Sequence, residues 1–306
     1  MTRAAGPGEL AAPKGRRRRS QGNPWLRRLV LLGPGITWWT LFFAVPVAIL
    51  FAYSFFRRGT FGGVVYELTL DNYRRAIDPI YLNVLWFSIR VAVITTGLAL
   101  LIGYPAAYFI ASGPRRLRLP LLVLVILPFW TSFLIRTYAW IVLLNPVGLI
   151  NRSLQGLGVT DGPLPLLYNE FAIVLGLVYA YLPLMILPLY ASIERLGPSV
   201  REVASDLGAP PANTFVRVTL PLTLPGIAAG CIFVFVPSLG NFIVPELLGG
   251  GRRIMMGNLI QQQFLQARDW PFGATLALFV VALMLVLLAI QARILNRERA
   301  QVDDGR

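Results

Sequence analysis

The chain has 306 residues, of which 56% are hydrophobic and 14% charged, with a formal net charge of +14. One soluble core cannot bury this much apolar side chain, so the composition indicates an integral membrane protein. With a single cysteine and no histidine, the chain also excludes an intrachain disulfide and an ordinary zinc site.

Six long apolar stretches follow one another along the chain, and each has about the 20 residues that a helix needs to cross the hydrocarbon core. They cover residues 31–55, 84–111, 119–143, 171–191, 222–244 and 273–294. An even number of spans places both termini on one side. Most of the 28 Lys and Arg residues flank that side, and because basic residues favour the cytoplasm, we predict that both termini are cytoplasmic.

The chain divides by composition into a basic tail at 1–24, which we predict to be disordered, a six-helix membrane domain at 25–298 and a short cytoplasmic tail at 299–306. An Arg-rich tail could suggest a nucleic-acid partner. However, the basic residues follow the membrane topology, and no soluble domain is left to use them. We therefore expect no nucleic-acid binding.

Two arginines, Arg90 and Arg136, fall inside predicted spans, where an ionised side chain costs at least about 2.5 kcal/mol near the centre. Arg90 is nearer the interface, where we expect its side chain to extend to the headgroups. Two interpretations of Arg136 stay open. Helix carbonyls or the acids at the outer ends of the fourth and fifth spans, Glu170 and Glu246, can anchor it, or it can line a transport pathway.

The fourth and fifth spans contain several helix-breaking residues, namely Pro183, Pro188, Pro225, Pro237 and Gly240. Proline frees a backbone carbonyl, which is tolerated at membrane depth where a neighbour or a cavity satisfies it. These two spans are therefore candidates to line a pathway. Because transmembrane helices tolerate proline in general, a purely structural role is equally open.

A polar stretch punctuated by Gly and Pro connects the fourth and fifth spans on the predicted cytoplasmic face. Ser199 and Glu202 fit a capping box that starts a short helix, and Gly208 is placed to end it in the left-handed conformation. A second short helix is expected to follow Pro210 and to end at Pro221. Four residues at helical spacing predict one apolar stripe on the first helix: Val200, Val203, Ala204 and Leu207.

The polar face of the first helix is led by Glu202 and Asp206, and residues 194–217 balance their acids against their arginines. A helix that binds anionic lipid usually carries Lys or Arg along its polar face. The charge balance therefore favours a protein partner over lipid.

The sequence EVASDLGA at 202–209, followed by LP at 220–221, resembles the cytoplasmic loop of ABC-importer permeases. The pattern of that loop is Glu-Ala-Ala, a glycine six residues after the glutamate, then Leu-Pro. Val203 replaces the first alanine, which is a conservative departure. Other stretches, from about residue 28 to 295, resemble the spermidine/putrescine-type branch: LTLDNYRR at 68–75, LPFWTSFLIRTYAW at 127–140, LPLLY at 164–168, YLPLMILPLY at 181–190 and PSLGNFIVPELLGG at 237–250.

This resemblance implies an all-α type I ABC importer transmembrane fold in the bacterial cytoplasmic membrane. It implies that residues 194–221 form a coupling loop that docks into a cytoplasmic ABC ATPase dimer. By position, the docking surface comprises Glu202, Ala204, Gly208 and Ala209, and Asp206 lies on the polar face beside them.

The resemblance also implies further partners: a second permease, usually a different chain, and an extracytoplasmic substrate-binding protein. The chain has one lysine, Lys14, and no phosphate-binding loop, so a partner must hydrolyse ATP. We therefore expect a transport subunit that is not itself an enzyme and holds no cofactor.

The candidate pathway residues are Arg136, Pro183, Pro237, Asn241 and Glu246. In the polyamine-type pattern an acidic residue often stands where this chain has Asn241, and an amide cannot offer a full charge to a cationic ligand. Glu246 can do so, but it is a single carboxylate. A polyamine is therefore expected from the resemblance, with other small solutes open.

Two other classes of protein compete with an ATP-driven importer. A secondary transporter is expected to show inverted repeats and ionisable groups at membrane depth, and neither is clear in this chain. A membrane-embedded enzyme needs a nucleophile and a base, and this chain shows no such constellation. The permease-type loop favours the importer, with the secondary transporter as the alternative.

Overall fold

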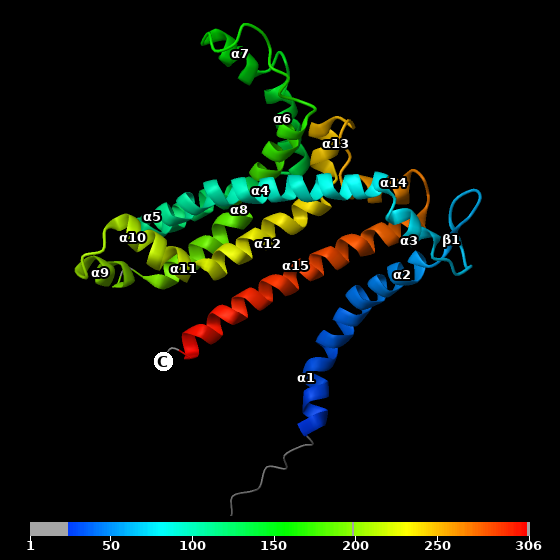
Figure 1. Ribbon diagram of the computed structural model, residues 1–306, viewed down its shortest axis with the longest axis horizontal. Coiled ribbons are helices and arrows are strands. Elements are labelled where there is room, and N and C mark those ends of the chain that lie inside the picture. Colours follow the sequence, from blue (N-terminus) through cyan, green and yellow to red (C-terminus); the bar gives the residue numbers. More distant parts are fainter. Residues whose placement is uncertain (1–23, 198, 305–306) are drawn as a thin grey trace, which may run out of the picture. The chain divides into compact units, whose positions relative to one another are not determined.

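A computed structural model describes residues 24–197 and 199–304; the side chains of 24–31, 199, 201, 202, 205 and 294–304 are outside this description. The predicted disordered tail at 1–24 therefore lies almost wholly outside the described residues. The described chain is mostly helical (Figure 1) and separates into two compact units, with the boundary between Ile49 and Leu50.

The described part of the first unit is helical throughout. It contains α1 (Pro24–Trp39), a π-helical turn η1 (Thr40–Ala44) and the first residues of α2 (Val45–Ser54). The apolar segment Leu32–Ser54 is long enough to cross a membrane, which confirms the first predicted span.

Four long helices form the body of the second unit: α4 (Pro79–Ser112), α8 (Glu170–Leu196), α12 (Leu224–Gly240) and α15 (Trp270–Asp304). Figure 1 shows them running lengthwise beside one another. The short β1 (Arg57–Arg58) and β2 (Val64–Val65), α3 (Asp71–Ala76) and α14 (Met256–Leu265) gather at one end. The segment with α9 (Ser199–Asp206) and α10 (Pro211–Thr214) lies at the other end, as alternating loops on two membrane faces require.

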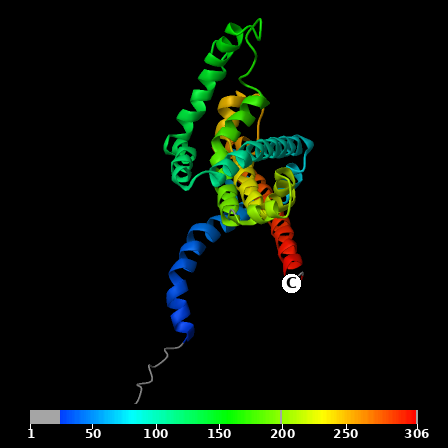
Figure 2. The same ribbon diagram turned by 90° about the vertical axis from the view of Figure 1, so that its left-hand side faces the viewer.

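The third predicted span is wrong as a single helix. Residues 119–143 are divided among α5 (Arg115–Ile126), a 3₁₀ turn η2 (Leu127–Trp130) and α6 (Phe133–Leu144). Pro128 supplies no backbone N–H, Thr131 is extended with ψ 151°, and the Thr131 hydroxyl donates to the Pro128 carbonyl at 2.8 Å. After this break, α6 and α7 (Leu149–Gly156) project away from the long helices (Figures 1 and 2).

The fifth predicted span is bent at its start and shorter at its end than expected. It is preceded by α10 (Pro211–Thr214), a π-turn η3 (Phe215–Thr219) and α11 (Leu220–Leu222), and Pro211–Leu222 meets Leu224–Gly240 at an angle of 65°. The described residues contain five helices long and apolar enough to cross a membrane, and a sixth if this bent pair counts as one span. With the bent pair counted as one span, the described residues contain the six spans that the sequence predicts.

The outer end of the fifth span also differs from the prediction. The helix stops at Gly240, and residues 243–249 form a separate helix, α13 (Ile243–Gly249). The chain is extended at Asn241, with ψ 132°, which ends the run of helical hydrogen bonds. The separation places Asn241 between the two helices, where the sequence had suggested a continuous helix, and Glu246 in the first turn of α13.

Three apolar clusters hold the second unit together. One joins α4, α8 and α13 through Val91, Ile173, Leu177 and Leu248, and a second joins α4, α8 and α12 around Met185. The third packs α15 against α12 and α14 through Phe272 and Leu276. Two glycines of α12 permit close approach to α8, because a Cβ at Gly226 would overlap Ser192 and one at Gly230 would lie 2.7 Å from the Met185 sulfur.

Candidate functional site

The polar loop between the fourth and fifth spans forms a short helix that ends in a glycine elbow. Helix α9 (Ser199–Asp206) begins where the sequence predicts, although the capping side chains of Ser199 and Glu202 are outside the described residues. Gly208 has φ +80°, and the Ala209 N–H donates to the Ala204 carbonyl at 3.0 Å. This is the six-to-one bond of a Schellman cap, and it confirms the predicted left-handed glycine.

The apolar stripe of α9 is divided between the protein interior and its surface. Ala204 is buried, whereas Val203 is 58% exposed and Leu207 83% exposed. Asp206 and Gly208 are exposed, and Ala209 is partly buried. Within the described chain, nothing covers Val203 and Leu207, so this end of the molecule presents an apolar surface beside a carboxylate, as a protein partner would require.

The loop is fixed to the bundle by contacts that the sequence analysis missed. The Phe215 ring packs edge-on against Tyr104 and Tyr108 of α4, with ring centroids 5.6 and 5.9 Å apart. At the 65° bend, the buried Thr223 hydroxyl bonds to the Tyr104 hydroxyl at 2.9 Å. These contacts join residues more than 100 positions apart, which no local pattern reveals.

At the opposite end of α12, Asn241 lies at the centre of a small polar cluster. Its Nδ2 donates to the Tyr181 hydroxyl at 2.7 Å, and its Oδ1 accepts from the Val244 N–H at 2.8 Å. The Tyr181 hydroxyl in turn donates to the Pro237 carbonyl at 3.4 Å. The structure therefore brings Asn241 and Pro237 together, and it adds Tyr181, which the sequence analysis did not single out.

The carboxylate of Glu246 lies on the surface at the start of α13. One of its oxygens accepts from Asn258 Nδ2 at 3.0 Å, and the same amide donates to the Phe242 carbonyl at 2.7 Å. Asn258 is buried, whereas Glu246 is exposed. The cluster thus holds the Glu246 carboxylate in place while leaving it accessible.

Two further residues near the proposed pathway, Pro183 and Gly257, are closely packed. Pro183 is buried inside α8. Gly257, at the start of α14, was not singled out by the sequence analysis, yet a Cβ there would lie 2.6 Å from the carbonyl oxygens of Gly240 and Asn241. Only glycine permits α14 to lie this close to the break after α12.

The two membrane-depth arginines differ from what we expected. Arg90 forms an ion pair with Glu170 at 2.5 Å, so it does not simply extend to the headgroups. Glu246 bonds to Asn258, and neither acid anchors Arg136. The Arg136 guanidinium instead lies over the rings of Phe129 and Phe133, 5.4 and 5.8 Å from their centroids. Anchoring of Arg136 by Glu170 or Glu246 is therefore wrong for the chain on its own.

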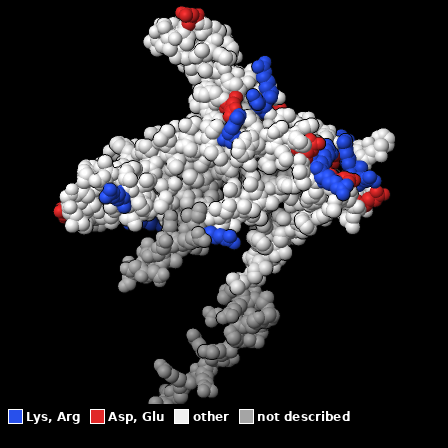
Figure 3. Space-filling model, in the orientation of Figure 1, with Lys and Arg blue, Asp and Glu red and all other residues white. Residues whose placement is uncertain are grey.

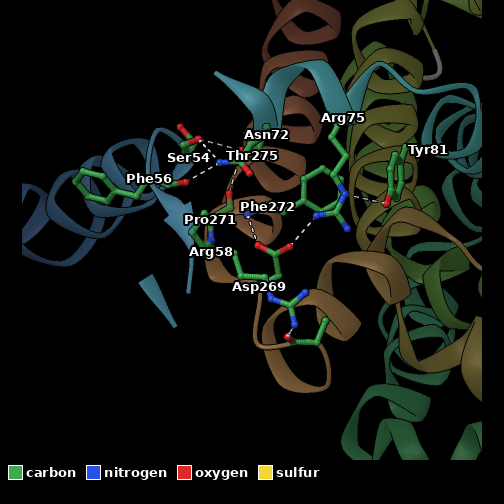
Figure 4. A network of polar contacts seen from close by, with 11 residues as sticks. Ser54, Phe56, Arg58, Asn72, Arg75, Tyr81, Asp269, Pro271, Phe272 and Thr275 are labelled. Carbon is green, nitrogen blue, oxygen red and sulfur yellow. Dashed lines mark hydrogen bonds and ion pairs between the residues drawn. The ribbon is translucent and has the colours of Figure 1, made fainter. Parts of the chain in front are cut away.

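A polar network ties together the end that carries the β-hairpin (Figure 4). Asn72 donates to the Ser54 and Phe56 carbonyls at 3.0 and 2.8 Å. Asp269, only 1% exposed, pairs with Arg75 at 2.8 Å, and Arg75 stacks 3.9 Å from the Phe272 centroid. Burial acts to lower the pKa of Arg75, but the hydrogen bonds to Asp269 and Tyr81 outweigh it and raise the pKa.

On the face shown in Figure 3, charged side chains form a large group at the end with β1 and β2, a smaller group near the base of the projecting α6 and a few near α9, and most of the surface along the long helices is uncharged. This is the distribution that a protein embedded in a bilayer needs. Within residues 24–197 and 199–304, no three His, Cys, Asp or Glu side chains come together to hold a metal ion.

The comparisons with known proteins agree with this arrangement. A family described as the inner membrane component of binding-protein-dependent transport systems matches residues 99–300, which include the loop with α9. The spermidine/putrescine transport system permease protein PotB of Escherichia coli K12 is 43% identical over 266 residues, covering 86% of this chain and 97% of PotB. PotB of Salmonella typhimurium LT2 is 42% identical over 272 residues, covering 88% and 95%.

The fold has also been seen in solved structures. A chain of a bacterial alginate ABC transporter, crystallised with its periplasmic protein, matches with a TM-score of 0.68 at 20% identity, covering 89% of this chain and 94% of that chain. Together these similarities leave no support for the secondary transporter, and they identify a transport subunit of the bacterial inner membrane and not an enzyme. The chain belongs to the family of inner membrane components of binding-protein-dependent transport systems, the permease subunits of ATP-driven importers.

Proposed function

We propose that this permease imports a polyamine of the spermidine/putrescine class. The observation that carries the proposal is 42 to 43% identity to PotB proteins along almost their whole length. The proposed complex contains this chain, a second and different permease, two cytoplasmic ABC ATPase subunits and an extracytoplasmic binding protein that delivers the solute. Both termini of this chain lie in the cytoplasm in this proposal, on the side of the basic tail and of α9.

In this proposal, α9 and its glycine elbow dock into the ATPase. The exposed Val203 and Leu207 supply an apolar contact, while Glu202 and Asp206 provide carboxylates and the small residues Ala204, Gly208 and Ala209 permit close approach. Such a surface suits an apolar cleft with a basic rim. ATP is bound and hydrolysed there and not on this chain, whose single lysine is Lys14 and which has no phosphate-binding loop.

Movement of the docked helix reaches the membrane through a short series of contacts. Phe215 packs on α4, and Thr223 bonds to Tyr104 where α11 meets α12. A displacement of α9 therefore acts on α4 and α12 together. Because α12 ends at the cluster around Asn241, the same helix joins the ATPase side to the proposed solute pathway.

The pathway is proposed to pass Asn241 and Glu246. Glu246 supplies an accessible carboxylate for one ammonium group, and the amide of Asn241 with the hydroxyl of Tyr181 supplies neutral acceptors nearby. Pro237 contributes its carbonyl to the same cluster, and Pro183 shapes α8 from within. One carboxylate is little for a polycation, so the second permease is expected to supply further acids.

Two measurements test this function. The tagged chain is purified gently from its native membrane, and mass spectrometry identifies what accompanies it. We expect an ATPase with a phosphate-binding loop and a second six-span permease; a folded chain that reproducibly purifies alone would contradict the importer assembly. Uptake of radiolabelled spermidine and putrescine is then compared in cells with and without the gene, and equal uptake under conditions where the gene is expressed would contradict the polyamine substrate.

A further inference from the structure

Arg136 carries an unpaired charge in an apolar setting. Its Nε and Nη1 atoms are shielded from solvent and have no hydrogen-bond acceptor among the described residues. The rings of Phe129 and Phe133 cover part of the guanidinium. A cation–π contact contributes much less than the cost of removing a guanidinium from water, so this arrangement calls for an acceptor from outside the chain.

Arg136 is one of the residues that line a groove between α6 and α8. The groove has a volume of ≈ 320 Å³ and is lined by Ile135, Arg136, Ala139, Trp140 and Tyr179 among others. Tyr179 is nine residues after Glu170, the first residue of α8, which corresponds to a depth of about 13 Å along that helix. Lipid headgroups do not reach this depth without distorting the bilayer.

The residues that line the groove include no Asp or Glu, and the acids named above have other partners. Glu170 pairs with Arg90, Glu194 with Arg118 and Asp269 with Arg75. Glu246 bonds to Asn258. A polycationic solute would be repelled by a guanidinium, so it does not complete the site either.

The face of α6 around Arg136 is also uncovered. Ile135 is 68% exposed, Leu134 49% and Val142 70%. An apolar helix face with one buried, unpaired cation is complementary to an apolar helix that carries one carboxylate.

We propose that a membrane-spanning helix of the second permease packs on this face of α6 and inserts an Asp or Glu carboxylate into the groove, where it pairs with Arg136. This inference rests on the proposed function, because it requires a second membrane subunit. In this proposal, Arg136 holds the two permeases together and does not contact the solute. The apolar side chains of α6 would then be covered by the same partner helix.

The experiment measures assembly of the full complex without reference to the solute. The tagged chain is co-expressed with its ATPase, the second permease and the binding protein, and the ratio of second permease to tagged chain is measured after mild solubilisation. We expect R136Q to lower this ratio by roughly tenfold or more, because it leaves the partner carboxylate buried and unpaired, and R136K to retain part of it. The abundance and monodispersity of the R136Q chain expressed alone should match wild type, since the Nε and Nη1 atoms of Arg136 have no acceptor among the described residues.

Two further variants keep the test decisive. A139L fills the groove while keeping the guanidinium, and it should lower the ratio as R136Q does. R152Q removes an exposed arginine of α7 and should assemble as wild type. Reversal of Arg136 to Asp should be rescued by a single Asp-to-Arg or Glu-to-Arg substitution in a span of the second permease.

Normal assembly of both R136Q and A139L would overturn the inference, whatever happens to uptake. Loss of bound anionic lipid from R136Q, with the second permease retained, would overturn it as well and assign the groove to lipid. Absence of any second permease from the wild-type preparation would instead overturn the proposed function itself.

Discussion

Replacement of Gly208 tests the coupling role of the α9 elbow most directly. With φ +80°, this residue occupies the left-handed region, and a Cβ at this position would meet no atom within 4 Å. A larger side chain at position 208 therefore costs free energy because it disfavours the left-handed backbone, and not because it overlaps neighbouring atoms. Left-handed backbone costs an L-residue about 1–2 kcal/mol, less for Asn and more for a β-branched side chain.

These energies predict a graded series. Each variant should reduce the population of chains with the elbow in its docking conformation, by roughly fivefold at 1 kcal/mol and thirtyfold at 2 kcal/mol. G208V should thus abolish uptake, G208A should impair it and G208N should stay near wild type, all with normal membrane abundance. The control is G158V, because Gly158 also has a positive φ of +70° and open space around its Cβ but lies far from the loop.

The assay is ATP hydrolysis by the reconstituted complex, stimulated by solute-loaded binding protein, together with solute uptake. Basal hydrolysis by the ATPase subunits alone should not change, since these variants alter only the permease. Wild-type uptake by G208V would refute the coupling role of the elbow. Equal loss with Asn and Val would refute the conformational reasoning, because Asn tolerates the left-handed region.

Three other changes test separate parts of the structure. G226A places a methyl group against Ser192 and should lower thermal stability in detergent by roughly 1–3 kcal/mol, whereas G97A, with open space at its Cβ, should not; equal stability of the two would contradict the packing of α12 on α8. E246Q should change the preference among cationic solutes or the stimulation of ATP turnover, and unchanged values of both would remove Glu246 from the pathway. D269N weakens a buried ion pair and should cost roughly 1–3 kcal/mol of stability, measured by thermal unfolding, with little effect on assembly if the network is only structural.

Local signals in the sequence were sufficient for much of the fold. Long apolar runs located the spans that became α4, α8 and α15, because the length of a run and its hydropathy decide whether a helix can cross the bilayer. The elbow at Gly208 was predictable for a similar reason, since a glycine at the end of a short amphipathic helix is a local feature.

The errors arose where distant residues decide the outcome. The apolar run continues on both sides of Thr131, so the hydropathy of the sequence did not reveal the break between η2 and α6. Arg90 pairs with Glu170, which lies 80 positions away in the sequence. Glu170 is therefore not available to Arg136, for which we expected it as a partner. Tyr181 escaped notice because a tyrosine inside an apolar run has no distinctive spacing, and Asn258 because it lies between two predicted spans. Only the folded chain places them beside Asn241 and Glu246.

The network around Asn72 has a mechanical consequence for the long C-terminal helix. Asn72 and Thr275 both bond to the Ser54 carbonyl, so α15 is anchored close to its first turn. Helix α15 has 35 residues and is therefore about 50 Å long. A rotation of about 5° around this anchor would displace the far end of α15 by roughly 4 Å and leave the end with β1 and β2 almost where it was, so the anchor makes that end the fixed point of such a motion.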